Sequence, residues 1–147
     1  MEKQEFRITI EAPKEKVWKA LWDKPSYEAW TTAFTAGSTV ETDNWKKGSK
    51  VLFLDGKGMG MVSQVNENIP NQFMSFKHLG EVKDGVEDTT SEKVKEWAGA
   101  TESYTLKENN GKTEVVVDME ITEEFMEMFK EIWPKALNKL KELAEKN

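Results

Sequence analysis

The sequence predicts one α+β domain in which antiparallel strands lie between short N-terminal helices and a long C-terminal helix. Three observations support this prediction. Residues 6–10 alternate apolar and polar side chains, the pattern of a half-buried strand. Asn110 and Gly111 join two strand-like segments, and this residue pair favours a two-residue type I′ hairpin turn. Apolar side chains then recur at helical spacing across residues 125–143.

Two short helices are predicted after the first strand. Pro13 suits the first turn of a helix, where its missing N–H costs nothing. The residues that follow repeat at four-residue spacing and give a broad apolar face, pairing Val17 with Leu21 and Trp18 with Trp22. The second helix is expected after Pro25 and carries three aromatic side chains, Tyr27, Trp30 and Phe34.

From Gly37 onward the sequence predicts strands and turns, about five or six strands before the terminal helix. Residues 49–65 are expected to form a hairpin with its turn at residues 55–58, and residues 71–82 form another strand. The glycine-rich turn lacks the Gly-Lys-Ser/Thr ending of a phosphate-binding loop and lies between strands. We therefore interpret it as a hairpin turn.

The polar segment at residues 83–100 is predicted to be a long loop that contains a short helix. Thr89 and Glu92 have the spacing of a capping box, in which each side chain bonds to the backbone N–H of the other residue. Trp97 is expected to hold this helix against the rest of the domain.

The register of the hairpin at residues 101–121 follows from its two-residue turn. Three pairs are expected to lie opposite each other: Leu106 with Val115, Tyr104 with Val117, and Glu102 with Met119. A slip by one residue would put Leu106 against Glu114 and break up the apolar face, so this register is the predicted one.

The terminal helix is predicted to begin after Thr122, whose side chain can cap it, with Glu123 and Glu124 in its first turn. Pro134 lies in the middle of this helix and cannot donate a hydrogen bond to the carbonyl of Lys130. We therefore expect a bend within a turn of Pro134. Beyond it, three leucines are expected to pack solidly, Leu137, Leu140 and Leu143.

The charge and hydropathy of the chain exclude several classes of partner. The net charge is −6 at pH 7, and basic residues alternate with acidic ones, which argues against nucleic-acid binding. No stretch reaches the ~20 apolar residues of a membrane span, and the charged N-terminus lacks the apolar core of a signal peptide. We expect a cytoplasmic protein with neither nucleic acid nor membrane as partner.

Little in the sequence predicts chemistry. His78 is the only histidine, and cysteine is absent, so thiolate nucleophiles and thiolate metal sites are excluded. His78 shares a strand face with Met74 and Phe76, and we interpret it as a hydrogen-bonded strand residue near an edge rather than a catalytic base. With one imidazole and no ligand spacing among the acidic residues, no catalytic residue, metal site or cofactor is predicted.

Glu102 is the sharper candidate for a functional residue. The hairpin register places it on the same face as Tyr104 and Leu106, where a carboxylate could exchange hydrogen bonds with a ligand. The alternative is that Glu102 lies at the end of the sheet, where its carboxylate reaches water.

Five segments carry a family resemblance, in the family's order and over nearly the whole chain: ITIEAPKEKVWKALWD, YEAWTTAF, GMVSQVNENIPNQFMSF, SYTLKENNGKTEVVVDMEI and WPKALNKLKEL. The chain resembles the START-like (SRPBCC, helix-grip) superfamily, and within it the branch named for its similarity to activators of the heat-shock-protein-90 ATPase. The resemblance implies a helix-grip fold over residues 1–147: a curved antiparallel sheet wrapped around the C-terminal helix, two short helices after the first strand, and a cavity between sheet and helix.

The chain has more Trp, Phe and Met than a core of this size requires, and together with the resemblance this favours binding of a small hydrophobic or aromatic ligand in the cavity over catalysis. Phe125, Met128, Phe129 and Ile132 are expected to face the sheet across the cavity. The full set of expected ligand-binding residues is Trp30, Phe34, Phe53, Phe76, His78, Glu102, Tyr104, Val117, Met119, Phe125, Met128, Phe129 and Ile132.

Two alternative functions remain open. One is a cyclase- or hydrolase-like enzyme that uses Glu102, His78 or Tyr104 as acid–base groups in the same cavity. The other is a protein-interaction domain with a chaperone partner, like the chaperone-ATPase activators. A large exposed apolar patch would favour the second alternative, and Trp45 and Trp97 are candidate contributors to it.

Overall fold

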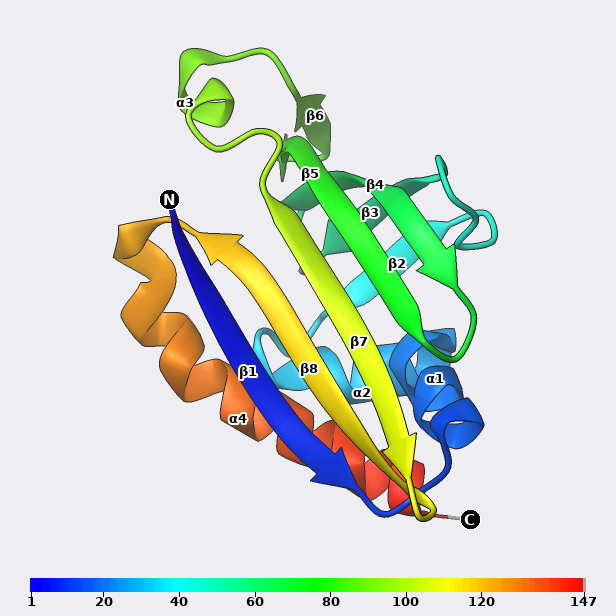
Figure 1. Ribbon diagram of the computed structural model, residues 1–147. Coiled ribbons are helices and arrows are strands. Elements are labelled where there is room, and N and C mark those ends of the chain that lie inside the picture. The colour runs from blue at the N-terminus through cyan, green and yellow to red at the C-terminus, as the bar shows by residue number, and fades with distance from the viewer. Residues whose placement is uncertain (147) are drawn as a thin grey trace.

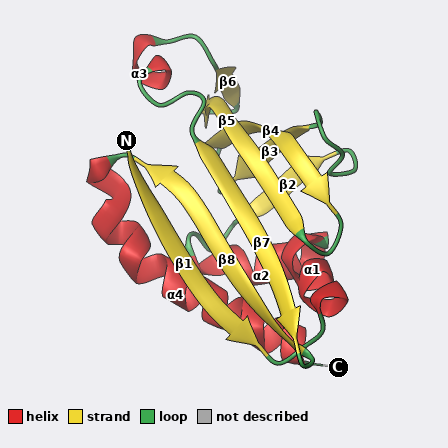
Figure 2. Ribbon diagram, in the orientation of Figure 1, coloured by secondary structure: helices red, strands yellow, loops and turns green. Residues whose placement is uncertain are grey.

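The computed structural model describes residues 1–146 and contains one antiparallel sheet of eight strands with a long C-terminal helix on one face (Figures 1 and 2). The strands are β1 (Glu2–Ile10), β2 (Thr39–Thr42), β3 (Lys50–Leu54), β4 (Gly60–Ile69), β5 (Phe73–Lys83), β6 (Val86–Asp88), β7 (Thr101–Asn109) and β8 (Lys112–Ile121). The helices are α1 (Lys14–Trp22), α2 (Lys24–Trp30), the 3₁₀ turn η1 (Thr31–Ala33), α3 (Glu92–Lys95) and α4 (Glu123–Glu145).

The sheet is curved, and its strand order is β1-β8-β7-β5-β4-β3-β2, with the short β6 paired to β5. Figure 1 shows α4 crossing one face of β1 and β8, with α1 and α2 on the same face and α3 beyond one end of the sheet. This arrangement is the predicted helix-grip fold. None of the helices within residues 1–146 is long and apolar enough to span a membrane.

The N-terminal elements form where predicted, with small shifts at the prolines, but α2 ends at Trp30, so Phe34 lies just after the 3₁₀ turn η1 and not on the helix. Pro13 is the residue that precedes α1, and its carbonyl accepts hydrogen bonds from the backbone N–H groups of Lys16 and Val17. The second helix begins at Lys24, so Pro25 lies within its first turn, where no backbone N–H is needed. Val17 and Leu21 of α1 are fully buried, which confirms the predicted apolar face.

Both predicted hairpins are present. The turn between β3 and β4 is held by the Asp55 carboxylate, which accepts hydrogen bonds from the backbone N–H groups of Lys57 and Met59 at 2.7 and 3.1 Å. Asn110 and Gly111 have φ angles of 55° and 79°, as a type I′ turn requires. The pairs Leu106–Val115, Tyr104–Val117 and Glu102–Met119 lie opposite each other between β7 and β8, so the predicted register is confirmed.

The segment at residues 83–100 is more ordered than predicted, because β6 adds to the edge of β5. Gly80 allows this approach, since a Cβ atom there would lie 2.1 Å from the carbonyl oxygen of Asp88. The capping position was predicted wrongly: the cap of α3 is Ser91, whose hydroxyl accepts from the backbone N–H of Val94 at 3.3 Å. Val94 is fully buried while Trp97 is only half-buried, so Val94 is the main anchor of α3.

The terminal helix α4 runs without interruption from Glu123 to Glu145, with Pro134 inside it. Thr122 precedes it as predicted, but its hydroxyl makes no capping bond and is buried with no partner among residues 1–146. Leu137 and Leu140 are buried against the sheet, as expected, and Leu143 packs against the same core. The bend near Pro134 stays a prediction.

The middle of α4 packs directly on the sheet through aromatic rings. The indole of Trp133 stacks on Phe6 at 5.7 Å between ring centroids and contacts Phe34 at 5.0 Å. Trp30 and Tyr104 approach the same indole at 6.1 and 6.2 Å. These contacts fill the space beneath Trp133, so an open hollow at this point of the helix is not confirmed.

Candidate functional site

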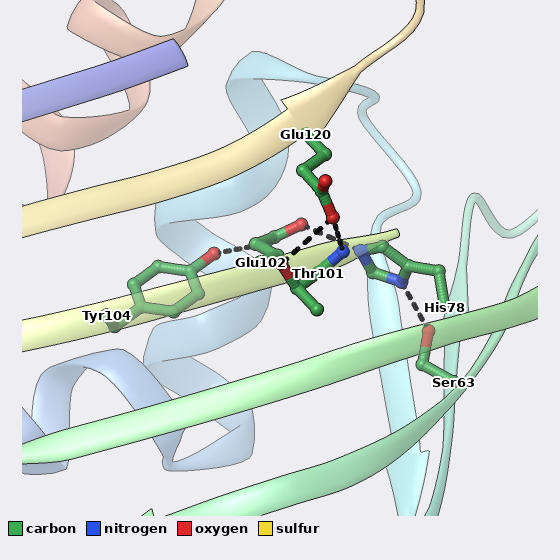
Figure 3. Close-up of polar contacts among 6 residues, drawn as sticks. All are labelled: Ser63, His78, Thr101, Glu102, Tyr104 and Glu120. Atoms are coloured by element: carbon green, nitrogen blue, oxygen red, sulfur yellow. Dashed lines mark hydrogen bonds and ion pairs between the residues drawn. The ribbon is translucent and has the colours of Figure 1, made fainter. Parts of the chain in front are cut away.

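A chain of four polar side chains crosses the helix-covered face of the sheet at the level of β4, β5 and β7. It consists of Ser63 on β4, His78 on β5, and Glu102 and Tyr104 on β7, and we call it the polar row (Figure 3). Three of its members, His78, Glu102 and Tyr104, are among the site residues predicted from the sequence, and the structure brings these three together.

The strand register explains why these residues meet. On β5 the side chains of Met74, Phe76 and His78 alternate onto the buried face, and Glu102 lies opposite Phe76 on the neighbouring strand. His78 therefore lies diagonal to Glu102, within reach of a long side chain. On the other side of β5, a register shift pairs Val62 with Gly80 but Ser63 with His78. This bulge aligns Ser63 with the imidazole.

The polar row is linked end to end by hydrogen bonds that converge on the Glu102 carboxylate. The hydroxyl of Tyr104 donates to Oε2, and His78 Nε2 lies 3.2 Å from Oε1. His78 Nδ1 lies 2.6 Å from Ser63 Oγ. A neutral imidazole that donates from Nε2 to the carboxylate leaves Nδ1 free to accept from the Ser63 hydroxyl. Every contact is then satisfied with Glu102 ionised.

Both tyrosines of the chain lie near this carboxylate. Burial raises the pKa of Tyr104 well above its ordinary value, and the charge of Glu102 raises it further. Burial also raises the pKa of Tyr27 on α2, and the charge of Glu102 raises it further. A hydrogen bond with Ser38 lowers this pKa and offsets part of the increase. Each phenol therefore stays protonated, and Tyr104 remains a hydrogen-bond donor to the carboxylate.

Access to the polar row is uneven. Ser63 is fully buried and Tyr104 nearly so, whereas 20% of the Glu102 side chain is exposed. A serine nucleophile must contact its substrate, so the burial of Ser63 argues against a serine hydrolase mechanism. Glu102 is the member that can reach a ligand, and a carboxylate there can accept a hydrogen bond or hold a positive charge.

His78 differs from its predicted position in one respect. It is hydrogen-bonded, as expected, but its backbone lies within the sheet rather than near an edge. The backbone N–H of His78 donates to the carbonyl of Ala100 at 2.8 Å on one side of β5. On the other side, Ser63 of β4 lies opposite His78 in the strand register. Among residues 1–146, no group of three or more acidic or histidine side chains could hold a metal ion.

The other predicted ligand-binding residues fall into three groups. Buried in the core are Trp30, Phe76, Val117 and Met119. Half-buried around it are Phe34, Phe53, Phe129 and Ile132. Exposed at 44% and 45% are Phe125 and Met128, which were expected to face the sheet.

Helix geometry explains the position of Met128. Trp133 marks the side of α4 that meets the sheet, and at about 100° per residue Met126 lies only about 20° from it. Met128 lies about 140° away by the same count, on the solvent side. Met126 is accordingly half-buried against the core, although it was not among the predicted ligand-binding residues.

Two residues of this region were missed. Ser63 joins the polar row through a bulge, and strand alternation gives no signal for it. Tyr27 was recognised on the aromatic face of α2, but strand and helix patterns do not indicate that it lies close enough to Glu102 on β7 for the carboxylate to raise its pKa. The broad aromatic face of α2 is the one signal that could have pointed to it.

Comparisons with known proteins agree with this fold. The solution structure of the Aha1 dimer from Colwellia psychrerythraea is similar with a TM-score of 0.73 and 23% identity, over 99% of this chain and 97% of that one. Protein MLL2253 from Mesorhizobium loti gives a TM-score of 0.75 at 16% identity, over 97% and 96% of the two chains. A Staphylococcus epidermidis protein gives 0.70 at 20% identity, over 97% and 88%.

At these identities the structural similarity establishes the fold alone. No curated protein matches the sequence. A family model described as activator of Hsp90 ATPase homolog 1-like protein matches residues 11–145.

Proposed function

Because the chain belongs to the family of activator of Hsp90 ATPase homolog 1-like proteins, a START-like branch, we propose that it binds a small hydrophobic or aromatic ligand. The ligand lies between the first half of α4 and the sheet, and Glu102 is its polar anchor. The observation that carries this proposal is the Glu102 carboxylate, which is held among aromatic rings and is still partly exposed.

The surroundings of Glu102 suit a ligand that is mostly apolar. Tyr27 and Phe53 lie in contact at 6.1 Å between ring centroids, and Phe53 approaches His78 at 6.4 Å. Apolar pockets with a few convergent polar groups are the usual form of small-molecule sites. A carboxylate in such a place favours a ligand that donates a hydrogen bond, because a ligand without a donor would remove water from the lone pairs that Tyr104 and His78 leave free.

The first turns of α4 supply the other wall of this site. Phe129 contacts Phe34 at 6.2 Å and Phe125 at 6.3 Å, and these rings remain half-buried or exposed. Trp133 closes the wall, and its indole N–H is buried with no hydrogen-bond partner among residues 1–146. The ligand that fits this site best is an aromatic compound with a hydrogen-bond donor for Glu102.

The proposal is tested with p-cresol and 4-methylanisole, which share a ring and a methyl group but differ in the hydroxyl donor. Binding is followed by displacement of an environment-sensitive dye from the wild-type protein. We expect p-cresol to bind about tenfold more tightly, and Glu102→Gln to reduce this preference. Glu120→Gln is the matched control, because Glu120 bonds to Thr101 outside the polar row (Figure 3). Equal binding of the two compounds would remove Glu102 as the anchor.

A second candidate function is an interaction with a chaperone, which the family description suggests. The observation that favours it is the exposure of Phe125 and Met128 in the first two turns of α4. Exposed apolar side chains that are close together mark protein interaction sites. A pull-down with Hsp90 that succeeds for the wild type and fails for Met128→Ser would favour this function over ligand binding.

A further inference from the structure

The Glu102 carboxylate lies where water reaches only a small part of it. The side chain is 20% exposed, and Phe76, directly opposite it on β5, is fully buried. Tyr104, two residues further along β7, is only 3% exposed. A negative charge in such surroundings is costly unless a positive charge lies close to it.

The chain supplies no lasting positive charge at this point. No lysine or arginine within residues 1–146 forms an ion pair with Glu102, and its one ionisable basic partner is His78. The Glu102 charge also raises the pKa of Tyr27 on α2, although the hydrogen bond of that phenol is with Ser38. The charge of the carboxylate therefore acts beyond its own hydrogen bonds.

The burial of Ser63 favours a neutral imidazole at His78. Ser63 is fully buried, and among residues 1–146 its hydroxyl has one hydrogen-bond partner, His78 Nδ1 at 2.6 Å. An imidazolium would carry a proton on Nδ1 and leave the serine O–H without an acceptor, which is costly in a buried place. With a neutral imidazole the serine donates to Nδ1, and Glu102 keeps its full negative charge.

We infer that the ligand held at Glu102 is a protonated amine with an aromatic or other apolar body. This inference deepens the proposed function and rests on it, because it takes Glu102 as the anchor. The ammonium group donates to the carboxylate lone pairs that Tyr104 and His78 leave free, and its charge compensates that of Glu102. A neutral donor satisfies the same lone pairs but leaves the charge uncompensated.

The apolar body of the amine contacts the half-buried rings beside the polar row. Phe53 is the nearest of them to the carboxylate along the chain of contacts, because its ring approaches the His78 ring at 6.4 Å. Phe53 is half-buried, so part of its side chain is open to a ligand. A ring or alkyl group attached to the ammonium by a short linker would reach it.

The test compares 4-methylbenzylamine with 4-methylbenzyl alcohol on the wild-type protein by dye displacement. The amine is protonated at neutral pH, and the two probes share the ring, the methyl group and a hydrogen-bond donor. We expect the amine to bind about tenfold more tightly. A poorly solvated pair is screened little by salt, so this preference should persist in about 0.5 M NaCl. A preference that salt abolishes would come from the net charge of −6 and would overturn the inference.

Two variants separate the Glu102 charge from other negative charges. Glu102→Gln keeps the shape and one acceptor oxygen but removes the charge, so the amine should bind it no more tightly than the alcohol does. Glu120→Gln is the matched control, because it removes one charge from the neighbouring strand β8, outside the polar row (Figure 3). We expect the control to keep the preference. Loss of the preference in both variants, or in neither, would overturn the inference.

His78 gives a second readout that needs no variant, since it is the only histidine. Its ring nitrogen resonances should show a neutral imidazole with the proton on Nε2, and the amine should shift the Nε2 resonance more than the alcohol does. An imidazolium at neutral pH would overturn the inference, because His78 would then already compensate Glu102. If Glu102→Gln fails to fold, this readout and the salt dependence on the wild type decide.

The inference and the proposed function fail in different ways. If p-cresol binds through Glu102 but the amine binds no more tightly than the alcohol, the ligand class is wrong and the anchor stands. If none of these compounds binds, Glu102 is not an anchor and both are wrong.

Discussion

The Tyr104 hydroxyl donates a hydrogen bond to the carboxylate of Glu102, two residues earlier on the same strand. Residues two apart on a strand share a face, so this bond needs no contact from elsewhere in the chain. This bond orients the Glu102 carboxylate along β7, and the His78 side chain on β5 forms a hydrogen bond with the other carboxylate oxygen. The anchor of the proposed ligand site is thus positioned by two neighbouring strands.

We predict that tyrosine ionisation in this protein is delayed until the chain unfolds in alkali. Tyr27 and Tyr104 are the two tyrosines, and both have a pKa raised above the ordinary value of 10.0 by burial and by Glu102. The folded state holds these protons while the unfolded state releases them near pH 10, so stability is complete below pH 10 and falls above it. An ultraviolet titration should show one cooperative step with unfolding, and a phenol that titrates near pH 10 in the folded protein would contradict this.

Loss of the Glu102 side chain is expected to destabilise the protein through its partners. In Glu102→Ala the Tyr104 hydroxyl and a His78 N–H lose their acceptor, and each buried unpaired donor costs roughly 1–3 kcal/mol. Glu102→Gln keeps one acceptor oxygen and should lose less. Urea denaturation measures both, and an Ala variant as stable as the wild type would show that these contacts are made equally well by water.

The two sides of α4 should respond differently to truncation. Leu140 is fully buried, so Leu140→Ala is expected to cost about 2–5 kcal/mol of unfolding free energy. Phe125 and Met128 are exposed, and Met128→Ala should change stability by less than about 0.5 kcal/mol. Thermal or urea unfolding compares the two variants. A large loss of unfolding free energy in Met128→Ala would contradict this orientation of α4, because it would mean that Met128 lies on the buried side of the helix.

Pro134→Ala tests the bend that is predicted in α4. Alanine restores an N–H that can donate to the carbonyl of Lys130, and in a helix interior it is favoured over proline by about 3 kcal/mol. We expect a more stable protein with a straighter helix, seen in residual dipolar couplings across residues 125–143. If the bend helps to hold the site near Glu102 open, p-cresol should bind the variant more weakly. Unchanged couplings would show that α4 is straight in the wild type.

Local patterns determined most of the secondary structure and one complete hairpin. The register between β7 and β8 was predictable because the turn type at Asn110 and Gly111 fixes which residues lie opposite each other. The strand alternation that puts Glu102 and Tyr104 on one face is equally local. The family was also predictable from sequence segments along nearly the whole chain, and the family model that matches residues 11–145 confirms this prediction.

The tertiary structure alone decided how distant elements meet. The bulge that places Ser63 beside His78 depends on the pairing of β4 with β5. The orientation of α4 about its own axis depends on the aromatic rings that pack against Trp133. Many apolar side chains of α4 could have faced the sheet, and ring packing selected Met126 over Met128. Such choices depend on contacts between residues far apart in the chain, whereas turns and alternation depend on backbone geometry over a few neighbouring residues.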